Sequence, residues 1–181
     1  GRRPNSGPNV DRTVVFLHWI NNEVGIFINT SGDTISKHGY RKIPFKAPMM
    51  ESLAAATLFA SAWDRKSHFI NPMCGSGTLA IEAAFLACSI PPGTFRKNFG
   101  FMHVRSYDEF SWSKLVKESI EQISKKLNFK IIATDINPKA IDAAKRNAEA
   151  AGVAELIEFK VCDFRKTFIP KGKGIVIFNP E

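Results

Sequence analysis

A glycine-rich turn between an apolar segment and a helix of small residues most constrains how this 181-residue chain can fold. The eight residues from Asn71 to Thr78 read Asn-Pro-Met-Cys-Gly-Ser-Gly-Thr. The apolar segment ends at Ile70, and residues 79–87 have the small and apolar side chains of a buried helix. Strand, glycine turn and helix in this order present backbone N–H groups and a helix N-terminus to a ligand. The motif predicts a site for a nucleotide-like cofactor in an α/β domain.

Three further apolar segments follow the glycine turn, and each ends in a polar residue. The first ends at Asp135, the second at Asp163 before Phe164, and the third at Asn179 before Pro180. The carboxyl ends of neighbouring parallel strands lie along one edge of a sheet, where ligands of such domains bind. A lone aspartate at such a place most often caps the next segment. Four polar strand ends together with a glycine turn predict one binding site.

The alternation of strand and helix patterns predicts the fold class α/β, with a doubly wound, Rossmann-like parallel sheet. Besides the helix after the glycine turn, helices are expected at 49–63, 111–127 and 137–151. The last begins with Asn137 as N-cap and ends at Gly152. Before the sheet, the patterns at 13–20 and 24–29 predict a β-hairpin.

Composition adds a weaker indication about partners and location. The chain has 25 Lys and Arg against 17 Asp and Glu, a net charge of +8, which favours a polyanionic partner such as a nucleic acid. Cys74, Cys88 and Cys162 form no Cys-x-x-Cys pair and no metal-ligand spacing, so we expect no metal site and a reducing, cytoplasmic location. No apolar run approaches the roughly 18 residues of a membrane span. We therefore expect no membrane insertion.

The order of these motifs resembles the class I S-adenosylmethionine-dependent methyltransferases that methylate exocyclic amines. The segments 29–33, 37–41 and 46–56 are similar to those that lead into the glycine turn of bacterial ribosomal RNA guanine-N2 methyltransferases with a THUMP RNA-binding domain. The similarity extends from about residue 8 to the end of the chain. It implies that a THUMP domain lies upstream and that later strands of the sheet follow. We expect the 181 residues alone to bind cofactor weakly and not to turn over.

The resemblance divides the chain in two. Residues 1–45 are assigned to a linker, with the Gly- and Pro-rich residues 1–9, and to the hairpin, as the end of an upstream RNA-binding region. Residues 46–181 are assigned to an incomplete class I methyltransferase core. The implied reaction is transfer of a methyl group to guanine N2 in ribosomal RNA, with RNA as the partner.

The resemblance also assigns roles to the strand-end residues. The turn and helix start would hold the methionine carboxylate of S-adenosylmethionine, Asn71 its amino group, and Asp135 the ribose hydroxyls. Asp163 would accept from the adenine amine, with Phe164 against the ring. The cofactor-binding residues are then Asn71, Met73, Cys74, Gly75, Ser76, Gly77, Thr78, Asp135, Ile136, Asp163 and Phe164.

Catalysis is assigned to Asn179 and Pro180. The side-chain oxygen of Asn179 and the carbonyl oxygen of Pro180 would accept the amine protons and stabilise positive charge developing on nitrogen, without a strong base. The sequence departs from the family at Asn71, where aspartate is usual, and at Glu181, where a second proline is common.

Several alternatives stay open from the sequence. Gly75, Gly77 and Ala80 fit a dinucleotide fingerprint, but no acid follows at the distance of about 20 residues that a ribose contact needs. A DNA adenine-N6 methyltransferase would share the strand-end motifs, and a non-catalytic RNA-binding module with a degenerate pocket is a third reading. The basic and aromatic residues 96–105 either contact RNA or pack within the protein, and the same two readings apply to His38, Tyr40 and Arg41.

Overall fold

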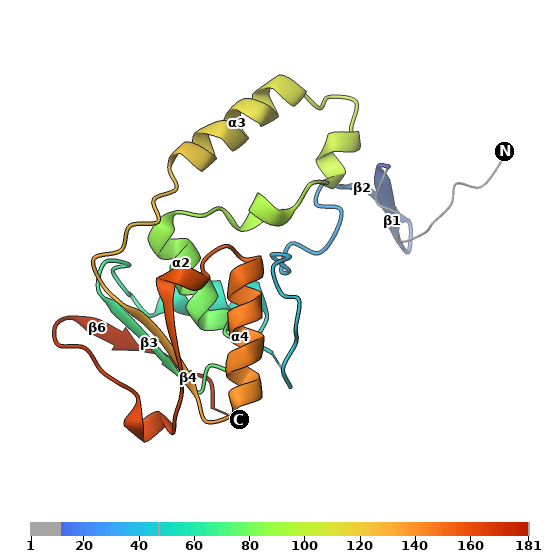
Figure 1. Cartoon of the computed structure of the whole chain (residues 1–181). Coiled ribbons are helices and arrows are strands. Elements are labelled where there is room, and N and C mark those ends of the chain that lie inside the picture. The colour runs from blue at the N-terminus through green and yellow to red at the C-terminus, as the bar shows by residue number, and fades with distance from the viewer. Residues whose placement is uncertain (1–11, 47, 181) are drawn as a thin grey trace. The chain divides into compact units, whose positions relative to one another are not determined.

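The computed structural model describes residues 12–46 and 48–180 (Figure 1). The chain forms two compact units, one of Gly1–Ile35 with Arg96–Glu118 and one of Ser36–Phe95 with Ser119–Glu181. The predicted linker at residues 1–9 lies outside the described residues, and the predicted boundary at residue 45 stays a prediction. No helix within the described ranges is long and apolar enough to cross a membrane.

The first unit contains the hairpin that the sequence predicted. Strands β1 (Val14–Ile20) and β2 (Glu23–Asn29) pair antiparallel, and Asn21 takes the positive φ of 53° that the tight turn requires. Beyond the hairpin, the backbone of Gly100 lies so close to the Asn29 carbonyl that a side chain at position 100 would collide with it. The short 3-10 helix Gly100–His103 is thereby held against the end of β2.

The second unit is built on a four-stranded parallel sheet, and the predicted fold class is confirmed. Its strands are β3 (His68–Pro72), β4 (Ile131–Asp135), β5 (Ile157–Val161) and β6 (Gly174–Val176), in the order β5-β4-β3-β6. The chain winds outward from β3 through β4 to β5 and then returns to place β6 on the other side of β3. The direction of winding therefore reverses between β3 and β6, which is where ligands of doubly wound sheets bind.

Helices α1 (Glu51–Ala60), α2 (Thr78–Cys88) and α4 (Pro138–Ala150) belong to the same unit, and α2 and α4 pack on the sheet (Figure 1). The register places the buried side chains of Phe69 and Ile131 side by side on one face of the sheet. Along α4, three buried alanines recur every four residues and so form one smooth stripe: Ala140, Ala144 and Ala148. Their small size allows the helix to approach its neighbours closely.

The connection from β5 to β6 runs over the opposite face of the sheet. Thr134 alternates with the core residue Ala133, so its side chain points away from the helices, and its hydroxyl forms a 2.7 Å hydrogen bond with that of Thr167. Ile70 and Ile132, which share this face, are 2% and 3% exposed. The opposite winding of this connection is what makes the sheet doubly wound.

Three predicted elements have different bounds in the structure. The helix expected at 49–63 ends at Ala60, because Ser61 ends the helical hydrogen bonding and Ala62 takes a positive φ of 55°. The helix expected at 111–127 is α3 (Glu109–Glu121), which begins earlier because the Asp108 carboxylate accepts from the N–H groups of Phe110 and Ser111. The apolar segment that ends at Asn179 was predicted to be a strand, and it forms one only from Gly174 to Val176.

The early end of α3 has a physical reason. Ile123 and Leu127, which continued the helical spacing in the sequence, leave the helix and pack against the core of the second unit. Their hydrophobicity reflects tertiary burial and not a helix face. By contrast α4 follows its prediction: the Asn137 side chain caps it by accepting from Lys139 N, and Gly152 takes a φ of 66° after its end.

The side chain of Asn147 joins three segments of the second unit. It is fully buried, its Oδ1 accepts from the N–H groups of Lys42 and Ile43, and its Nδ2 donates to the carbonyls of Ile43 and Ser76. All four hydrogen-bonding positions of this amide are thus used. Asn147 fixes the segment before α1 and the glycine turn to α4.

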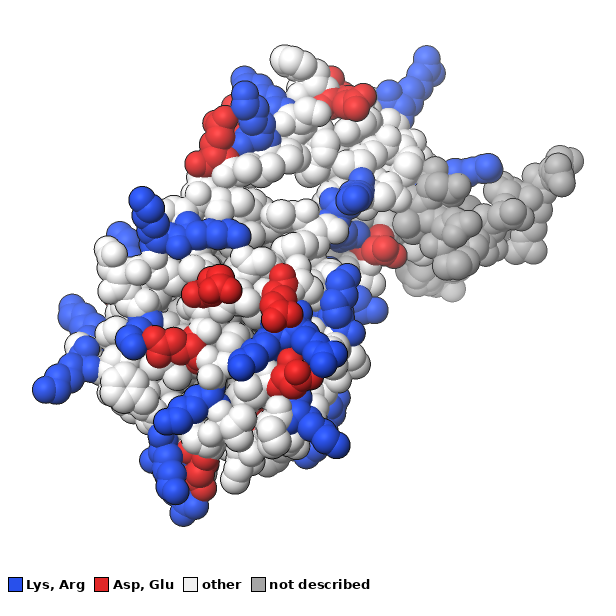
Figure 2. Space-filling model, viewed as in Figure 1, with Lys and Arg blue, Asp and Glu red and all other residues white. Residues whose placement is uncertain are grey.

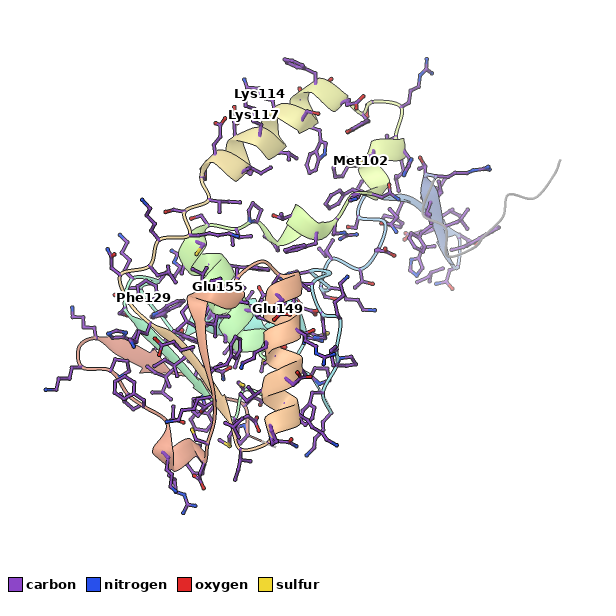
Figure 3. The ribbon with its side chains drawn as sticks, in the orientation of Figure 1. Met102, Lys114, Lys117, Phe129, Glu149 and Glu155 are labelled. Carbon is purple, nitrogen blue, oxygen red and sulfur yellow. The ribbon has the colours of Figure 1, made fainter. Side chains whose placement is uncertain are left out.

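We predict that Asn147→Ala lowers the free energy of unfolding by about 3 kcal/mol, because several buried backbone groups lose their partner at once. Urea denaturation of the purified chain measures this loss. Glu149→Ala on the same helix, at an exposed position labelled in Figure 3, serves as the matched control and should change stability by less than about 0.5 kcal/mol. Equal losses for the two variants would contradict the assigned role of Asn147.

Candidate functional site

A cavity of about 310 Å³ opens at the carboxyl ends of β3, β4 and β6, where the winding of the sheet reverses. Its volume is at the lower end of what small-molecule sites have. The predicted residues that line it are Asn71, Met73, Cys74, Gly75, Ser76, Thr78, Asp135, Ile136 and Asn179. Residues from three of the four predicted strand ends, Asn71, Asp135 and Asn179, therefore meet at one place.

The glycine turn leaves β3 and begins α2 in a few residues by using left-handed backbone conformations. Met73, Gly75 and Gly77 have positive φ values of 52°, 54° and 82°. Gly77 N donates to Cys74 O at 2.9 Å, and Gly77 is the residue before α2. A Cβ atom on Gly77 would lie 2.9 Å from the Cβ of Ala144 in α4, so this glycine also permits the contact between turn and helix. Gly77 supports the cavity without lining it.

Asp135 connects the end of β4 to the glycine turn. Its Oδ2 accepts from Gly75 N at 3.0 Å, and its Oδ1 accepts from Asn137 N at 2.9 Å. A carboxylate oxygen accepts more than one hydrogen bond, so both oxygens keep a capacity for ligand hydroxyls. The carboxylate thus holds the turn and lines the cavity at once.

Asn71 has an unusual environment at the end of β3. Its side chain is 1% exposed, and its Nδ2 donates to the Ile177 carbonyl at 3.0 Å. Its Oδ1 is buried without a hydrogen-bond partner. A buried amide oxygen without a partner is costly, so this acceptor is suited to a donor that enters the cavity.

Asp163 and Phe164 are not brought to the cavity lining. Asp163 begins the 3-10 helix Phe164–Lys166 and accepts from Arg165 through the backbone N–H at 2.9 Å and the guanidinium at 2.7 and 3.0 Å. These hydrogen bonds from Arg165 hold the pKa of the Asp163 carboxyl well below its usual range. The Phe164 side chain is half-exposed. Their assigned roles at the adenine stay predictions.

The cavity contains one residue of the predicted catalytic pair. Asn179 lines the cavity beyond the end of β6, whereas Pro180 follows it outside the lining. Glu181, the second departure from the family pattern, lies outside the described residues. Burial, with a further contribution from Asp135, raises the pKa of the Cys74 thiol, so this cavity residue stays protonated. Among the described residues, no group of three or more His, Cys, Asp and Glu is arranged to hold a metal ion.

One wall of the cavity was not predicted from the sequence. Phe45, Lys46, Pro48 and Met49 line it from the segment before α1, together with Leu79 and Asn137. This wall is fixed by Arg41, whose guanidinium donates to the carbonyl of Met49 and to Thr78 Oγ1, the latter at 3.0 Å. In the sequence, only Pro44 and Pro48 indicated that this segment is irregular, and no local pattern predicted that it would lie against the cavity.

The question whether His38 and Tyr40 contact RNA is settled by their burial. They are 7% and 1% exposed, and His38 Nδ1 lies 2.8 Å from Glu82 Oε1 in α2. Burial, together with the nearby Glu82, raises the pKa of the Tyr40 hydroxyl. These side chains belong to a buried polar cluster within the second unit and are not available to a nucleic acid.

The aromatic residues of 96–105 also pack against protein. In the first unit, the rings of Phe99 and Phe101 stack at 5.3 Å, and Trp112 meets both of them edge-on. Arg96 lies over Phe99 and donates to the carbonyls of Ser31 and Asp33. These contacts favour the packing alternative over a platform for unpaired bases.

Comparison with known proteins identifies the family. Residues 38–180 match the family described as UPF0020, RMKL-like, methyltransferase domain. The chain belongs to this family. The resemblance seen in the motifs is confirmed at this level, and the dinucleotide alternative is excluded.

Members and solved relatives of the RMKL-like family resemble the chain over nearly its whole length. A ribosomal RNA large subunit methyltransferase K/L of Shewanella baltica (strain OS195) is 41% identical over 96% of the chain, which spans 26% of that protein. A crystal structure of SMU.472, a putative methyltransferase complexed with SAH, has a TM-score of 0.85 and 29% identity, covering 98% of this chain and 45% of that one. A predicted N6-adenine-specific DNA methylase from Listeria monocytogenes has a TM-score of 0.80 and 33% identity, covering 92% and 43%. The chain therefore spans about a quarter of the curated relative.

The two glycines of the turn allow a matched test of the geometry. We predict that Gly77→Ala lowers the free energy of unfolding by about 3 kcal/mol, from backbone strain and from the clash with Ala144. Gly75→Ala suffers the strain alone, because nothing lies within 4 Å of its added Cβ, and should lose about 1 kcal/mol. Urea denaturation of both variants measures the difference. A larger loss for Gly75→Ala would refute the proposed contact between the turn and α4.

Proposed function

We propose that this chain is the cofactor-binding part of an S-adenosylmethionine-dependent RNA methyltransferase that modifies an exocyclic amine, guanine N2 in ribosomal RNA. The proposal is supported by the Shewanella relative, which is named as a ribosomal RNA large subunit methyltransferase, and by the SMU.472 structure, which is complexed with SAH. The observation that carries it is the partnerless Asn71 Oδ1 in the same cavity as Asp135 and Asn179.

The cavity residues fit S-adenosylmethionine group by group. Asn71 Oδ1 is an acceptor without a donor, as the methionine amino group requires. The turn from Gly75 to Thr78 and the N-terminus of α2 favour a carboxylate. Asp135 offers acceptors for hydroxyl groups. Each of these groups thus offers the kind of interaction that the corresponding part of the cofactor needs.

The proposed chemistry requires little beyond placement. When bound, S-adenosylmethionine supplies an electrophilic methyl group on sulfur. The Asn179 side-chain oxygen and the Pro180 carbonyl would accept hydrogen bonds from the N–H groups of the target amine, which directs its lone pair and stabilises the positive charge that develops on nitrogen. The methylated nitrogen would then release one proton to solvent. Fixed placement of the amine in the cavity lowers the entropic part of the barrier.

RNA as the substrate is supported by charge as well as by the relatives' names. The net charge of +8 attracts phosphates at long range. Figure 2 shows basic side chains distributed over the visible surface with acidic ones between them. The charge thus favours encounter with RNA without defining a single track for it. A cytoplasmic location, where ribosomal RNA is modified, belongs to the same proposal.

A DNA adenine-N6 methyltransferase is the second candidate. It is favoured by the Listeria structure, which is described as a predicted N6-adenine-specific DNA methylase. The acceptors at Asn179 and Pro180 suit any planar exocyclic amine and do not separate guanine from adenine. The nucleic acid that is modified must therefore be determined directly.

The test is to incubate the complete protein that contains this chain with S-adenosylmethionine and either unmodified ribosomal RNA or duplex DNA. The digested nucleosides are then analysed by mass spectrometry. We predict N2-methylguanosine from RNA, and a loss of at least about 100-fold in rate for Asn179→Ala, because one acceptor for the developing charge is removed. Glu149→Ala, exposed on α4, is the control and should keep the wild-type rate.

Each other outcome has a definite meaning. N6-methyladenine from DNA would replace the proposal by the second candidate. Full activity of Asn179→Ala would reject the assigned catalytic role. SAH binding, measured by calorimetry, without any methylated nucleoside would contradict the proposed substrates, and absence of SAH binding would leave a non-catalytic RNA-binding module.

A further inference from the structure

The two ends of the Asn71 amide have different hydrogen-bonding surroundings. Nδ2 donates to the Ile177 carbonyl at 3.0 Å, whereas the buried Oδ1 has no partner and Asn71 lines the cavity. The assignment of the two ends follows from Ile177, because its carbonyl is an acceptor and only the NH₂ end can bond to it. The partnerless oxygen is therefore the end left for a ligand.

Two backbone groups of Ile177 form hydrogen bonds with residues of β3. Its N–H donates to the Ile70 carbonyl at 2.9 Å, and its own carbonyl accepts from Asn71. Strand β6 is assigned only as far as Val176, so these two hydrogen bonds extend the attachment toward the Asn-Pro motif. Asn179 follows Ile177 by two residues. One side chain thus reaches both the cavity and the segment that carries the proposed amine acceptor.

We propose that Asn71 is a positioning residue that couples occupancy of the cofactor site to the placement of Asn179. The inference rests on the proposed function. An ammonium group that donates to Oδ1 polarises the amide and strengthens the donation from Nδ2 to Ile177, since linked hydrogen bonds reinforce one another. The amide is planar, so a ligand that orients its oxygen also orients its nitrogen. Cofactor binding then holds residues 177–179 in place for the incoming amine.

An aspartate at this position would separate the two roles. Its carboxylate keeps an acceptor for the cofactor's amino group and adds a charge that favours it. Its second oxygen would face the Ile177 carbonyl, and two acceptors form no hydrogen bond. Asn71→Asp should therefore retain cofactor binding and lose the coupling, whereas Asn71→Ala loses both.

The coupling is measured on the complete protein that contains this chain, with SAH as the probe. Calorimetry gives the affinity, and amide hydrogen exchange read by mass spectrometry gives the protection of the peptide that carries Ile177, Phe178 and Asn179. For the wild type we expect SAH to slow exchange at these amides by about tenfold or more. For Asn71→Asp we expect an affinity equal to or above that of the wild type, with no added protection. For Asn71→Ala we expect binding about tenfold weaker, as for a lost hydrogen bond to a charged group.

A ligand change provides the same test without a substitution, in case a variant fails to fold. An SAH analogue that lacks the α-amino group should bind the wild type without protecting residues 177–179. Equal protection by SAH and this analogue, or equal protection in wild type and Asn71→Asp, would overturn the coupling while leaving the proposed function intact. Absence of SAH binding by the wild type would overturn the proposed function and the coupling together.

Discussion

The attachment of the glycine turn to β4 and α4 is the constraint on which the rest of the site depends. Three consecutive residues of the turn are each held by a different group of this strand–helix unit: Gly75 N by the Asp135 carboxylate, Ser76 O by the Asn147 amide, and Gly77 by contact with Ala144. Ala144 and Asn147 lie three residues apart and so share one face of α4. With the turn fixed in this way, Ser76 and the first residue of α2, Thr78, line the cavity.

The second unit also buries two acidic side chains, and each of them has a basic partner nearby. Glu51 and Glu82 are 4% and 2% exposed, and a buried carboxylate without partners would be strongly unfavourable. Arg41 lies 3.7 Å from Glu51, and His38 lies 2.8 Å from Glu82. Arg41 also donates to Thr78 at the start of α2, so the group that neutralises a buried charge places a cavity residue as well. Such pairs add little net stability, but they fix one arrangement of the segment before α1 relative to the turn.

The fold and half of the site could be predicted because their signals are local. Asn137 before Pro138 specifies a helix start, and an apolar run that ends at Asp135 specifies a strand with a polar end. The remainder depends on tertiary contacts. Asp163, like Asp135, follows an apolar segment in the sequence. In the structure its carboxylate accepts from Arg165, and no sequence pattern predicts whether such an acid binds a neighbouring arginine or a ligand. The wall formed by Phe45, Lys46, Pro48 and Met49 has no periodicity to detect. Its place depends on Asn147, which accepts from Lys42 and Ile43 at a separation of more than 100 positions along the chain.

The reversal of winding between β3 and β6 explains why the cofactor residues and the amine acceptor are neighbours although about 100 residues separate them. The segments that follow β3, namely α2, β4 and α4, form the proposed cofactor site on one side of this strand. The later segment that returns through β6 on the other side brings Asn179 to the cavity. The backbone pairing that joins the returning part to β3 is short: its register runs from His68 with Gly174 to Ile70 with Val176. Because so few backbone hydrogen bonds hold β6, a single side-chain bond from Asn71 to Ile177 is a large fraction of what fixes the Asn-Pro segment. A residue at this junction is therefore in a position to transmit the state of one half of the site to the other.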